Sequence, residues 1–281
     1  MIDRRQMMNY SSVLVTGASS GIGRACAELL AARAYSVFGV ARQFSPGMHR
    51  DVRCFEADVN DEESIGQTIE KATQASGGVL DVIINAAGFA VAGPIEVTPI
   101  EDARAQFETN FFGVVRVSQM VLPSMRRKRR GLIVNIGSMA GFVALPYQGF
   151  YAASKFALEG YSETLAMEVR AFNVHVTLVE PGDFRTEFTA KRRHVPLAAM
   201  DADYREPFEE TITAVAQSEM DAPEPHRVAE LVASILDDPA PKIRYPIGSP
   251  HRIAYVTRDL LAKAEVVKAA VPALKDREQR S

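Results

Sequence analysis

Short apolar runs alternate with helical patterns along most of the chain. Strand-like runs lie at residues 13–16, 35–40, 52–57, 79–84, 132–136, 174–179 and 243–247. The run at 79–84 is apolar at nearly every position, which is typical of a parallel strand buried on both faces. Between the runs, apolar residues recur at helical spacing, as Ile22, Cys26 and Leu29 do.

Two of the expected helices begin with capping signals. Asn60 and Glu63 have the spacing of a capping box. Thr98, Pro99 and Glu101 offer an N-cap, a proline at the first helical position and an acid at the third. We therefore expect one helix to be capped at Asn60 and another at Thr98.

The alternation of strands and helices predicts an α/β fold. We expect a Rossmann-type doubly wound parallel sheet with helices on both faces and right-handed crossovers. No linker or repeat divides the chain, so residues 1–281 are predicted to form a single domain. The stretch at about 183–221 is the one large insertion, and we expect it to be a substrate-binding loop. Ligands of such sheets bind beyond the carboxyl ends of the strands.

A glycine-rich turn follows the first strand and opens the first helix. Its sequence is Thr16-Gly17-Ala18-Ser19-Ser20-Gly21-Ile22-Gly23, with GxxxGxG spacing rather than the commoner GxGxxG. Glycines let the backbone approach a ligand, and the helix N-terminus offers its N–H groups to a pyrophosphate. We expect a dinucleotide here, held by Gly17, Ser19, Ser20, Gly21, Ile22 and Gly23.

The end of the second strand indicates which dinucleotide is bound. An acid there would accept a hydrogen bond from the ribose 2′-hydroxyl, whereas an arginine would neutralise a 2′-phosphate. This chain has Ala41 and Arg42 at that place. NADP(H) is therefore predicted in preference to NAD(H). The alternative is that Arg42 is only solvated and that the preference is weak or mixed.

Composition and charge narrow the function classes. The chain has 281 residues, 47% of them apolar, a net charge of −3 and a pI near 6.0. It therefore has no electrostatic footprint for nucleic acid, and no apolar run reaches the roughly 18 residues of a membrane span. The charged N-terminus has no apolar signal segment, so we expect a cytoplasmic protein. The two cysteines and five histidines have no metal-ligand spacing, so no metal site is predicted.

A Tyr/Lys pair and a serine supply candidate chemistry. Tyr151 and Lys155 are four residues apart, so they share a helix face. By itself this spacing also fits an incidental surface pair. Ser138 follows the run at 132–136, at the edge where ligands bind, and Asn110 stands in a helical pattern although asparagine is a poor helix former.

These motifs together resemble one protein family. Thr16 to Gly23, Asn85-Ala86-Ala87-Gly88, Asn110, Ser138, Tyr151 with Lys155, and Pro181-Gly182 with Thr186 occur in the order and approximate spacing of the short-chain dehydrogenase/reductase family. The resemblance spans residues 11–188, and Ala86 departs from the second asparagine of many members. The run at 151–187 is most similar to the branch with hydroxysteroid and retinol dehydrogenases.

The resemblance implies a role for each site residue. Tyr151 would be the general acid/base, with its pKa lowered from about 10 by Lys155 and the positive nicotinamide ring. Ser138 would hold the substrate oxygen, and Asn110 would kink its helix and relay water to the lysine. Cofactor contacts would come from Asp58, Val59, Asn85, Ala87, Gly88, Pro181, Gly182 and Thr186, and from Tyr151 and Lys155. The family usually forms homodimers or homotetramers.

The predicted activity is an NADP(H)-dependent oxidoreductase that interconverts a ketone or aldehyde and an alcohol. Apolar walls suit a lipophilic small-molecule substrate, and we expect them from Phe89, Phe142, Val143, Leu145, Tyr147, Phe150, Phe184, Phe188 and Leu197. Two alternatives remain open at this point. One is a binding protein that senses the nucleotide without turnover, and the other is a lyase or epimerase without net redox change.

Overall fold

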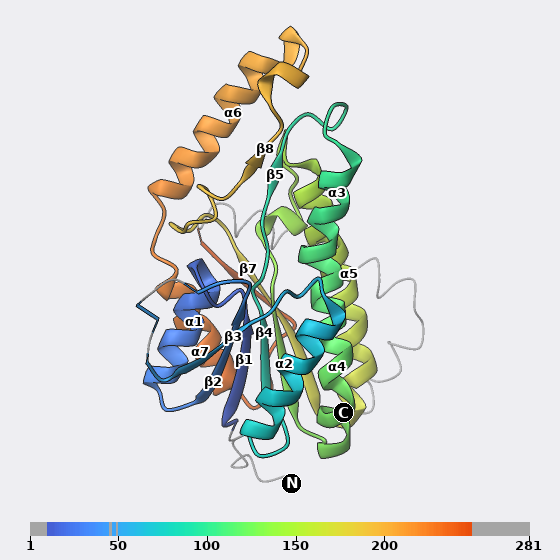
Figure 1. Ribbon diagram of the computed structural model, residues 1–281, viewed down its shortest axis with the longest axis vertical. Helices are drawn as coiled ribbons and strands as arrows, with labels where there is room; N and C mark the ends of the chain where they lie inside the picture. Colours follow the sequence, from blue (N-terminus) through green and yellow to red (C-terminus); the bar gives the residue numbers. More distant parts are fainter. Residues whose placement is uncertain (1–9, 45–46, 49, 249–281) are drawn as a thin grey trace, which may run out of the picture.

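A parallel sheet runs through the middle of the molecule (Figure 1). The computed structural model describes residues 10–44, 47, 48 and 50–248. Within them the main sheet has the strand order β3-β2-β1-β4-β6-β7-β9. The strands are β1 (Ser12–Thr16), β2 (Ser36–Ala41), β3 (Val52–Glu56), β4 (Val82–Asn85), β6 (Gly131–Ile136), β7 (Val174–Pro181) and β9 (Arg244–Ile247). Every predicted strand is present, with ends shifted by at most three residues.

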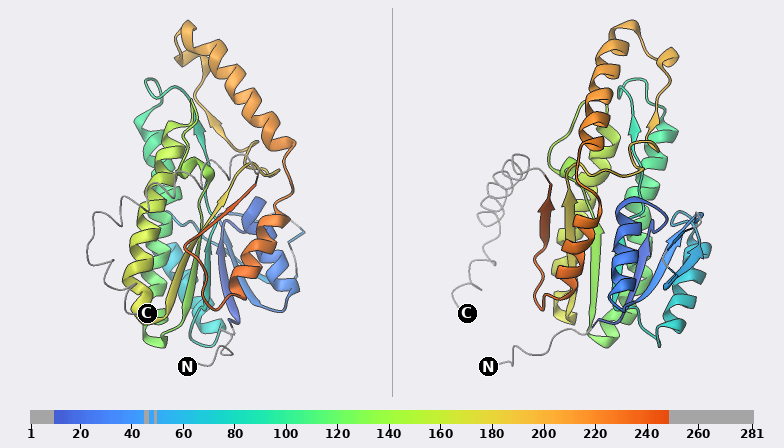
Figure 2. Two further views of the ribbon diagram at one scale, coloured as in Figure 1. Left: turned by 180° about the vertical axis from the view of Figure 1, so that it is seen from behind. Right: turned by 90° about the vertical axis from the view of Figure 1, so that its left-hand side faces the viewer.

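Helices cover both faces of this sheet, which confirms the predicted Rossmann-type doubly wound fold (Figures 1 and 2). One core lies under α1 (Gly21–Ala32) and α7 (His226–Leu236), and the other under α2 (Glu62–Ala75), α4 (Gly113–Lys128) and α5 (Gly149–Val169). Val13 and Val15 of β1 belong to the first core, whereas Leu14 between them belongs to the second. This burial on both faces explains why the strands read as continuous apolar runs.

The cap of α2 lies one residue later than predicted. Asp61 is the N-cap, and its carboxylate accepts hydrogen bonds from the N–H groups of Glu63 at 3.0 Å and Ser64 at 3.1 Å. The predicted capping box with Asn60 is therefore wrong. The Asn60 side chain instead donates to the Thr109 hydroxyl at 3.0 Å. Asp and Asn cap helices about equally well, so the sequence pattern did not separate neighbouring positions.

The cap predicted at Thr98 is also wrong by one residue. The helix α3 (Ile100–Phe107) follows Pro99, which occupies the cap position without a side-chain cap bond. The Thr98 hydroxyl donates to the carbonyl oxygen of Pro94 at 2.7 Å, within the preceding turn. Glu101 and Asp102 do lie in the first turn, where negative charge complements the helix dipole.

The segment 183–221 is not the simple loop that we expected. It contains α6 (Ala202–Met220) and the short strand β8 (Arg193–His194), which pairs in parallel with β5 (Val91–Ala92). A small separate core joins these parts, formed by Ala92, Val195, Met200, Phe208 and Ile212. Figures 1 and 2 show α6 extending beyond the carboxyl ends of the main strands. Short 3-10 turns within the described residues are η2 (Met139–Gly141), η3 (Arg170–Phe172) and η4 (Leu197–Ala199).

Metal and membrane features are not found in the part of the chain that the structure describes. There, no group of three or more His, Cys, Asp or Glu side chains could hold a metal ion. None of the described helices is both long and apolar enough to cross a bilayer.

Charged side chains are buried where α5, β7 and β9 meet. Arg244 of β9 forms ion pairs with Glu159 at 3.0 Å, Glu163 at 3.1 Å and Glu180 at 3.4 Å. The side chain of Glu180 has no exposed area, and that of Glu159 is 8% exposed. Burial raises the pKa of Glu159 to about 7 and that of Glu180 to about 8, because the carboxylate form loses its hydration. We name Glu159, Glu180 and Arg244 the buried charge cluster.

We expect the free energy of unfolding to fall as the pH rises from about 5 to about 8. Both carboxyl groups have folded-state pKa values above their ordinary 4.5, so their stabilisation is complete below that value and is lost as the pH passes about 7 and 8. Glu180→Gln should remove much of this slope and add on the order of 1–3 kcal/mol of stability at pH 8. Urea denaturation at both pH values measures the slope.

Glu168→Gln is the matched control for this substitution, because Glu168 lies exposed on α5. The control should leave the pH slope as it is in the unmodified chain. An equal slope in Glu180→Gln and in the unmodified chain would contradict the expectation.

Candidate active site

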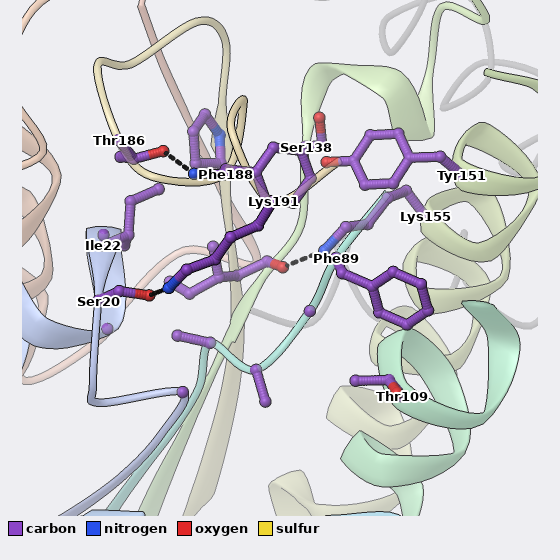
Figure 3. A pocket seen from close by; sticks show the side chains of 18 of the residues that line it. Ser20, Ile22, Phe89, Thr109, Ser138, Tyr151, Lys155, Thr186, Phe188 and Lys191 are labelled. Atoms are coloured by element: carbon purple, nitrogen blue, oxygen red, sulfur yellow. Dashed lines mark hydrogen bonds between the residues drawn. The ribbon is translucent and has the colours of Figure 1, made fainter. Parts of the chain in front are cut away.

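A cavity of about 850 Å³ lies at the carboxyl ends of the central strands (Figure 3). Parallel sheets bind their ligands at this edge, as the sequence predicted. Most of the predicted site residues line the cavity, namely Gly17, Ser19, Ser20, Gly21, Ile22, Gly23, Arg42, Asp58, Val59, Ala87, Gly88, Ser138, Tyr151, Lys155, Pro181, Gly182 and Thr186. The structure does not bring Asn85 and Asn110 to the cavity wall.

The glycine turn is packed too tightly for any other residue at two positions. At Gly17 the backbone has φ of +68°, and a Cβ there would lie 2.7 Å from the Ala87 nitrogen. A Cβ at Gly23 would lie 2.4 Å from the Gly17 carbonyl oxygen. The backbone itself therefore forms this wall, and the N-terminus of α1 follows at the cavity edge. Exposed amide groups at a helix N-terminus fit a pyrophosphate, so the residues present fit a dinucleotide.

The far end of the same wall is formed by the segments after β2 and β3. Arg42 directly follows β2 and is exposed, with its side chain lining the cavity. Asp58 and Val59 follow β3, and the Asp58 carboxylate accepts a hydrogen bond from the Asn60 N–H at 3.0 Å. These residues lie where the sequence placed the adenosine half of the cofactor.

The side chain of Asn85, which we expected to be one of the cofactor-binding residues, is buried in the core. Asn85 is 3% exposed, and its Nδ2 donates to Asn135 Oδ1 at 2.9 Å, across the β4–β6 pair. The segment that follows is held by Thr16 instead. The Thr16 hydroxyl accepts hydrogen bonds from the N–H groups of Ala86 at 3.2 Å and Ala87 at 3.3 Å. The end of β4 is thereby fixed against the glycine turn.

Tyr151 and Lys155 both face the cavity from the first turns of α5 (Figure 3). The Lys155 ammonium is buried and donates a hydrogen bond to the Ile136 carbonyl oxygen at 2.8 Å. Its Nζ lies 5.9 Å from the centroid of the Tyr151 ring. Ser138 directly follows β6, and its side chain is hydrogen-bonded to Tyr151. Three of the four predicted catalytic residues are thus brought together.

Burial determines the protonation of this group. Burial raises the pKa of Tyr151 above the ordinary 10.0, and the hydrogen bond from Ser138 offsets only part of this rise. Burial also lowers the pKa of Lys155 to about 8, although the charge of Glu159 acts in the opposite direction. We expected a lowered Tyr151 pKa, and the chain by itself does the opposite because a buried phenolate loses its hydration. Tyr151 is therefore protonated at neutral pH.

Asn110 lies in a π-helical turn, η1 (Glu108–Phe112), between α3 and α4. Its Nδ2 donates to the Phe89 carbonyl oxygen at 3.0 Å and to Ser154 Oγ at 3.3 Å, and its Oδ1 accepts from the Phe89 N–H at 3.1 Å. The helix irregularity expected at Asn110 is present as this wider turn. The side chain holds the wall residue Phe89 rather than facing the cavity.

Gln106 makes similar contacts and was missed in the sequence. Its Oε1 accepts from the Val91 N–H at 2.8 Å, and its Nε2 donates to the Phe89 carbonyl oxygen. Gln106 has no exposed area. Its position four residues before Asn110 on a helix was a signal that could have identified it.

The apolar walls are only partly those predicted. The cavity is lined by Phe89, Val143, Leu145, Phe184 and Phe188, but not by Phe142, Tyr147, Phe150 or Leu197. Phe142 packs on Met139, and Tyr147 packs on Phe208 in the core under α6. Phe142 and Tyr147 were predicted as wall residues because an aromatic side chain reads alike in sequence whether it lines a cavity or fills a core. Leu197 is instead exposed. Met139, Gln148, Lys191, Arg193 and Glu219 also line the cavity and were missed.

Comparison with known proteins found a family model and several relatives that match this chain. The model of the short chain dehydrogenase family matches residues 11–196. A 3-ketodihydrosphingosine reductase of Bacteroides thetaiotaomicron is 40% identical over 241 residues, which cover 86% of this chain and 89% of that protein. Estradiol 17-beta-dehydrogenase 1 of Rattus norvegicus is 32% identical over 259 residues, which cover 85% of this chain and 74% of that protein.

A solved structure also resembles this chain. A short-chain dehydrogenase from Streptomyces avermitilis has a TM-score of 0.74 and 29% identity, with 96% of this chain and 98% of that chain covered. The predicted resemblance to hydroxysteroid and retinol dehydrogenases is confirmed, since retinol dehydrogenase 8 of Bos taurus also matches.

The tight packing of the glycine turn predicts a large effect of a small substitution. Gly23→Ala places a Cβ against the Gly17 carbonyl oxygen, so we expect a loss of about 1–3 kcal/mol in the free energy of unfolding. Gly66→Ala, in α2, is the control. A Cβ at Gly66 would meet only Met120 Cε, at an ordinary contact distance of 3.7 Å. That control should gain about 0.4–1 kcal/mol. Urea denaturation measures both, and equal effects of the two substitutions would refute the packing argument.

Proposed function

The chain belongs to the short-chain dehydrogenase/reductase family, and we propose that it is an NADP(H)-dependent oxidoreductase that interconverts a ketone or aldehyde and an alcohol. The observation that carries the proposal is the meeting of Ser138, Tyr151 and Lys155 in one cavity with the glycine turn (Figure 3). A bound nicotinamide would supply or accept the hydride. The remaining steps are proton transfer and positioning, which fall to this chain's own residues.

Tyr151 would be the general acid in the reducing direction. Its phenolic proton passes to the substrate oxygen as the carbonyl becomes an alcohol, and in the reverse direction the phenolate takes the proton back. Burial keeps the pKa of Tyr151 high, which favours the proton-donating form. The Ser138 hydroxyl, hydrogen-bonded to Tyr151, would orient the same substrate oxygen.

Lys155 would stabilise the phenolate and hold the cofactor ribose. An ammonium has three N–H donors, and the Ile136 carbonyl oxygen takes one of them. The others are available to the cavity that Lys155 lines. Asn110 would act indirectly, by fixing Phe89 and the turn beside Ser154. A water relay from Asn110 to Lys155, as the family resemblance implies, remains part of the proposal.

The proposed cofactor is NADP(H), with NAD(H) as the less favoured form. Arg42 supports this choice because it lines the cavity directly after β2, where a 2′-phosphate would need a positive partner. Asp58 and Val59 would face the adenine, and Pro181, Gly182 and Thr186 would face the nicotinamide.

The proposed substrate is a lipophilic carbonyl compound or secondary alcohol. Phe89, Val143, Leu145 and Phe188 give the cavity an apolar side near Tyr151, and Phe188 lies 5.6 Å from the Tyr151 ring centroid. The relative from Bacteroides thetaiotaomicron is a reductase whose name gives 3-ketodihydrosphingosine as substrate, which is a lipid ketone. We propose that residues 183–221 form the substrate-binding part of a single domain, which assembles into homodimers or homotetramers.

Tyr151→Phe should lower the rate of NADPH-dependent ketone reduction by about 10²–10⁴-fold, because the proton donor is lost. Absorbance of NADPH with a panel of long-chain ketones, steroids and aldehydes measures the rate. Tyr161→Phe, on the same helix and outside the cavity lining, should keep the rate of the unmodified chain.

The same assay separates the alternatives. A nucleotide-sensing protein would bind NADPH without oxidising it, and a lyase or epimerase would convert substrate without net change in NADPH. Full activity of Tyr151→Phe would contradict the proposed acid/base role.

Arg42→Ala should weaken NADP⁺ binding by about 10–100-fold, the size of one or two hydrogen bonds to a charged group, and leave NAD⁺ binding nearly unchanged. Titration of both dinucleotides by calorimetry measures the two affinities. Arg33→Ala is the control, because Arg33 is exposed at the end of α1 and does not line the cavity. An equal loss for both dinucleotides would exclude Arg42 as the residue that selects NADP(H).

A further inference from the structure

One turn of chain after β7 reaches back to the first helix of the fold. The Lys191 N–H donates to the Glu187 carbonyl oxygen at 3.0 Å, which makes residues 187–191 a single turn. The side chains at both ends of this turn contact the N-terminus of α1. We name residues 187–191 the strap. Nothing in the local sequence of the strap indicates this contact, which joins residues more than 160 positions apart.

Glu187 places a carboxylate on the helix N-terminus. Its Oε2 accepts a hydrogen bond from the Gly21 N–H at 3.0 Å. The approach is close, because a Cβ at Gly21 would lie 3.4 Å from Thr186 Cβ. Free N–H groups and the positive end of the helix dipole favour an anion at this point. Glu187 therefore occupies an anion position beside the glycine turn.

Lys191 reaches the same turn with a positive charge. Its Nζ donates to Ser20 Oγ at 2.9 Å, and Figure 3 shows the side chain extending across the cavity to Ser20. Ser20 is the N-cap of α1, and its side chain makes no cap bond of its own. An ammonium whose partner is a neutral hydroxyl can make a stronger, charge-assisted hydrogen bond when an anion arrives.

Contacts with α6 hold the strap, and with it Lys191, in place. Arg192, the next residue, is 7% exposed and pairs with Glu219 of α6 at 2.5 Å. The Thr189 hydroxyl donates to the same Glu219 at 2.5 Å. A buried ion pair of this kind fixes geometry more than it adds stability. The position of the strap over the glycine turn is thus set by α6.

We propose that Lys191 binds the pyrophosphate of the dinucleotide, and that Glu187 holds the same place on α1 until the pyrophosphate displaces it. The inference rests on the proposed dinucleotide site but not on turnover or on the preference for NADP(H). A carboxylate and a pyrophosphate next to each other on one helix N-terminus repel, so Glu187 must leave the Gly21 N–H when the ligand binds. Lys191 loses a hydroxyl partner and gains a charged one.

The test uses ADP-ribose as the probe, because it carries the pyrophosphate but neither the nicotinamide nor the 2′-phosphate. Calorimetry should show ADP-ribose bound about tenfold more weakly by Lys191→Met than by the unmodified chain. Lys191→Arg keeps the charge and should bind within about threefold of the unmodified chain. Lys71→Met, exposed on α2, is the matched control and should bind as the unmodified chain does.

Glu187→Gln tests the second half of the proposal. The amide can still accept from the Gly21 N–H but carries no charge, so ADP-ribose should bind severalfold more tightly. Equal or weaker binding would overturn the displacement of Glu187.

A second probe, 2′-AMP, separates the pyrophosphate from the 2′-phosphate. If Lys191→Met weakened 2′-AMP and spared ADP-ribose, or changed neither, the role of Lys191 would be overturned. ADP-ribose binding together with no oxidoreductase activity would instead count against the proposed function alone.

Discussion

The burial of a charged ammonium, Lys155, is the constraint around which the site is built. Removing an ammonium from water is costly unless partners compensate, and the lowered pKa of Lys155 reflects that cost. The Ile136 carbonyl oxygen takes one of its hydrogen bonds, and the Glu159 carboxyl group one helical turn away supplies negative charge. Glu159 in turn belongs to the buried charge cluster with Arg244 and Glu180. Lys155 thus connects the cavity to the buried charge cluster through the charge of Glu159.

Much of the fold could be predicted because its signals are local. A central parallel strand is buried on both faces, so it reads as an apolar run whatever its neighbours are. The glycine turn was identified for the same reason, since its backbone geometry admits no side chain at Gly17 or Gly23. The caps predicted at Asn60 and Thr98 were each wrong by one residue. Asp61 offers the same chemistry as Asn60, whereas Pro99 takes the cap position of its helix without a side-chain bond.

Contacts between distant segments could not be predicted in this way. Spacing places Tyr151 beside Lys155 but gives no measure of burial, which in the chain by itself raises the pKa of Tyr151. The strap residues Glu187 and Lys191 meet α1 only because α6 holds them there. Glu159, which the sequence analysis did not single out, could have been identified, because it lies four positions after Lys155 on the same helix. A charged residue that continues the helix face of Tyr151 and Lys155 is therefore a candidate for contact with that pair.

The π turn η1 has a consequence for how this chain tolerates changes in length. Residues 100–128 form one continuous helical stretch, in which α3 packs against α5 and α4 packs against α2 and β6. A π turn takes up one residue more than an α turn, so removing one residue from η1 would let it close to an α turn and leave the faces of α3 and α4 as they are. The apolar face of α4 would still point to the sheet, but the wider turn that places Asn110 against Phe89 would be lost. The π turn is therefore the position within residues 100–128 where a related chain could lose one residue and keep α3 and α4 packed as they are.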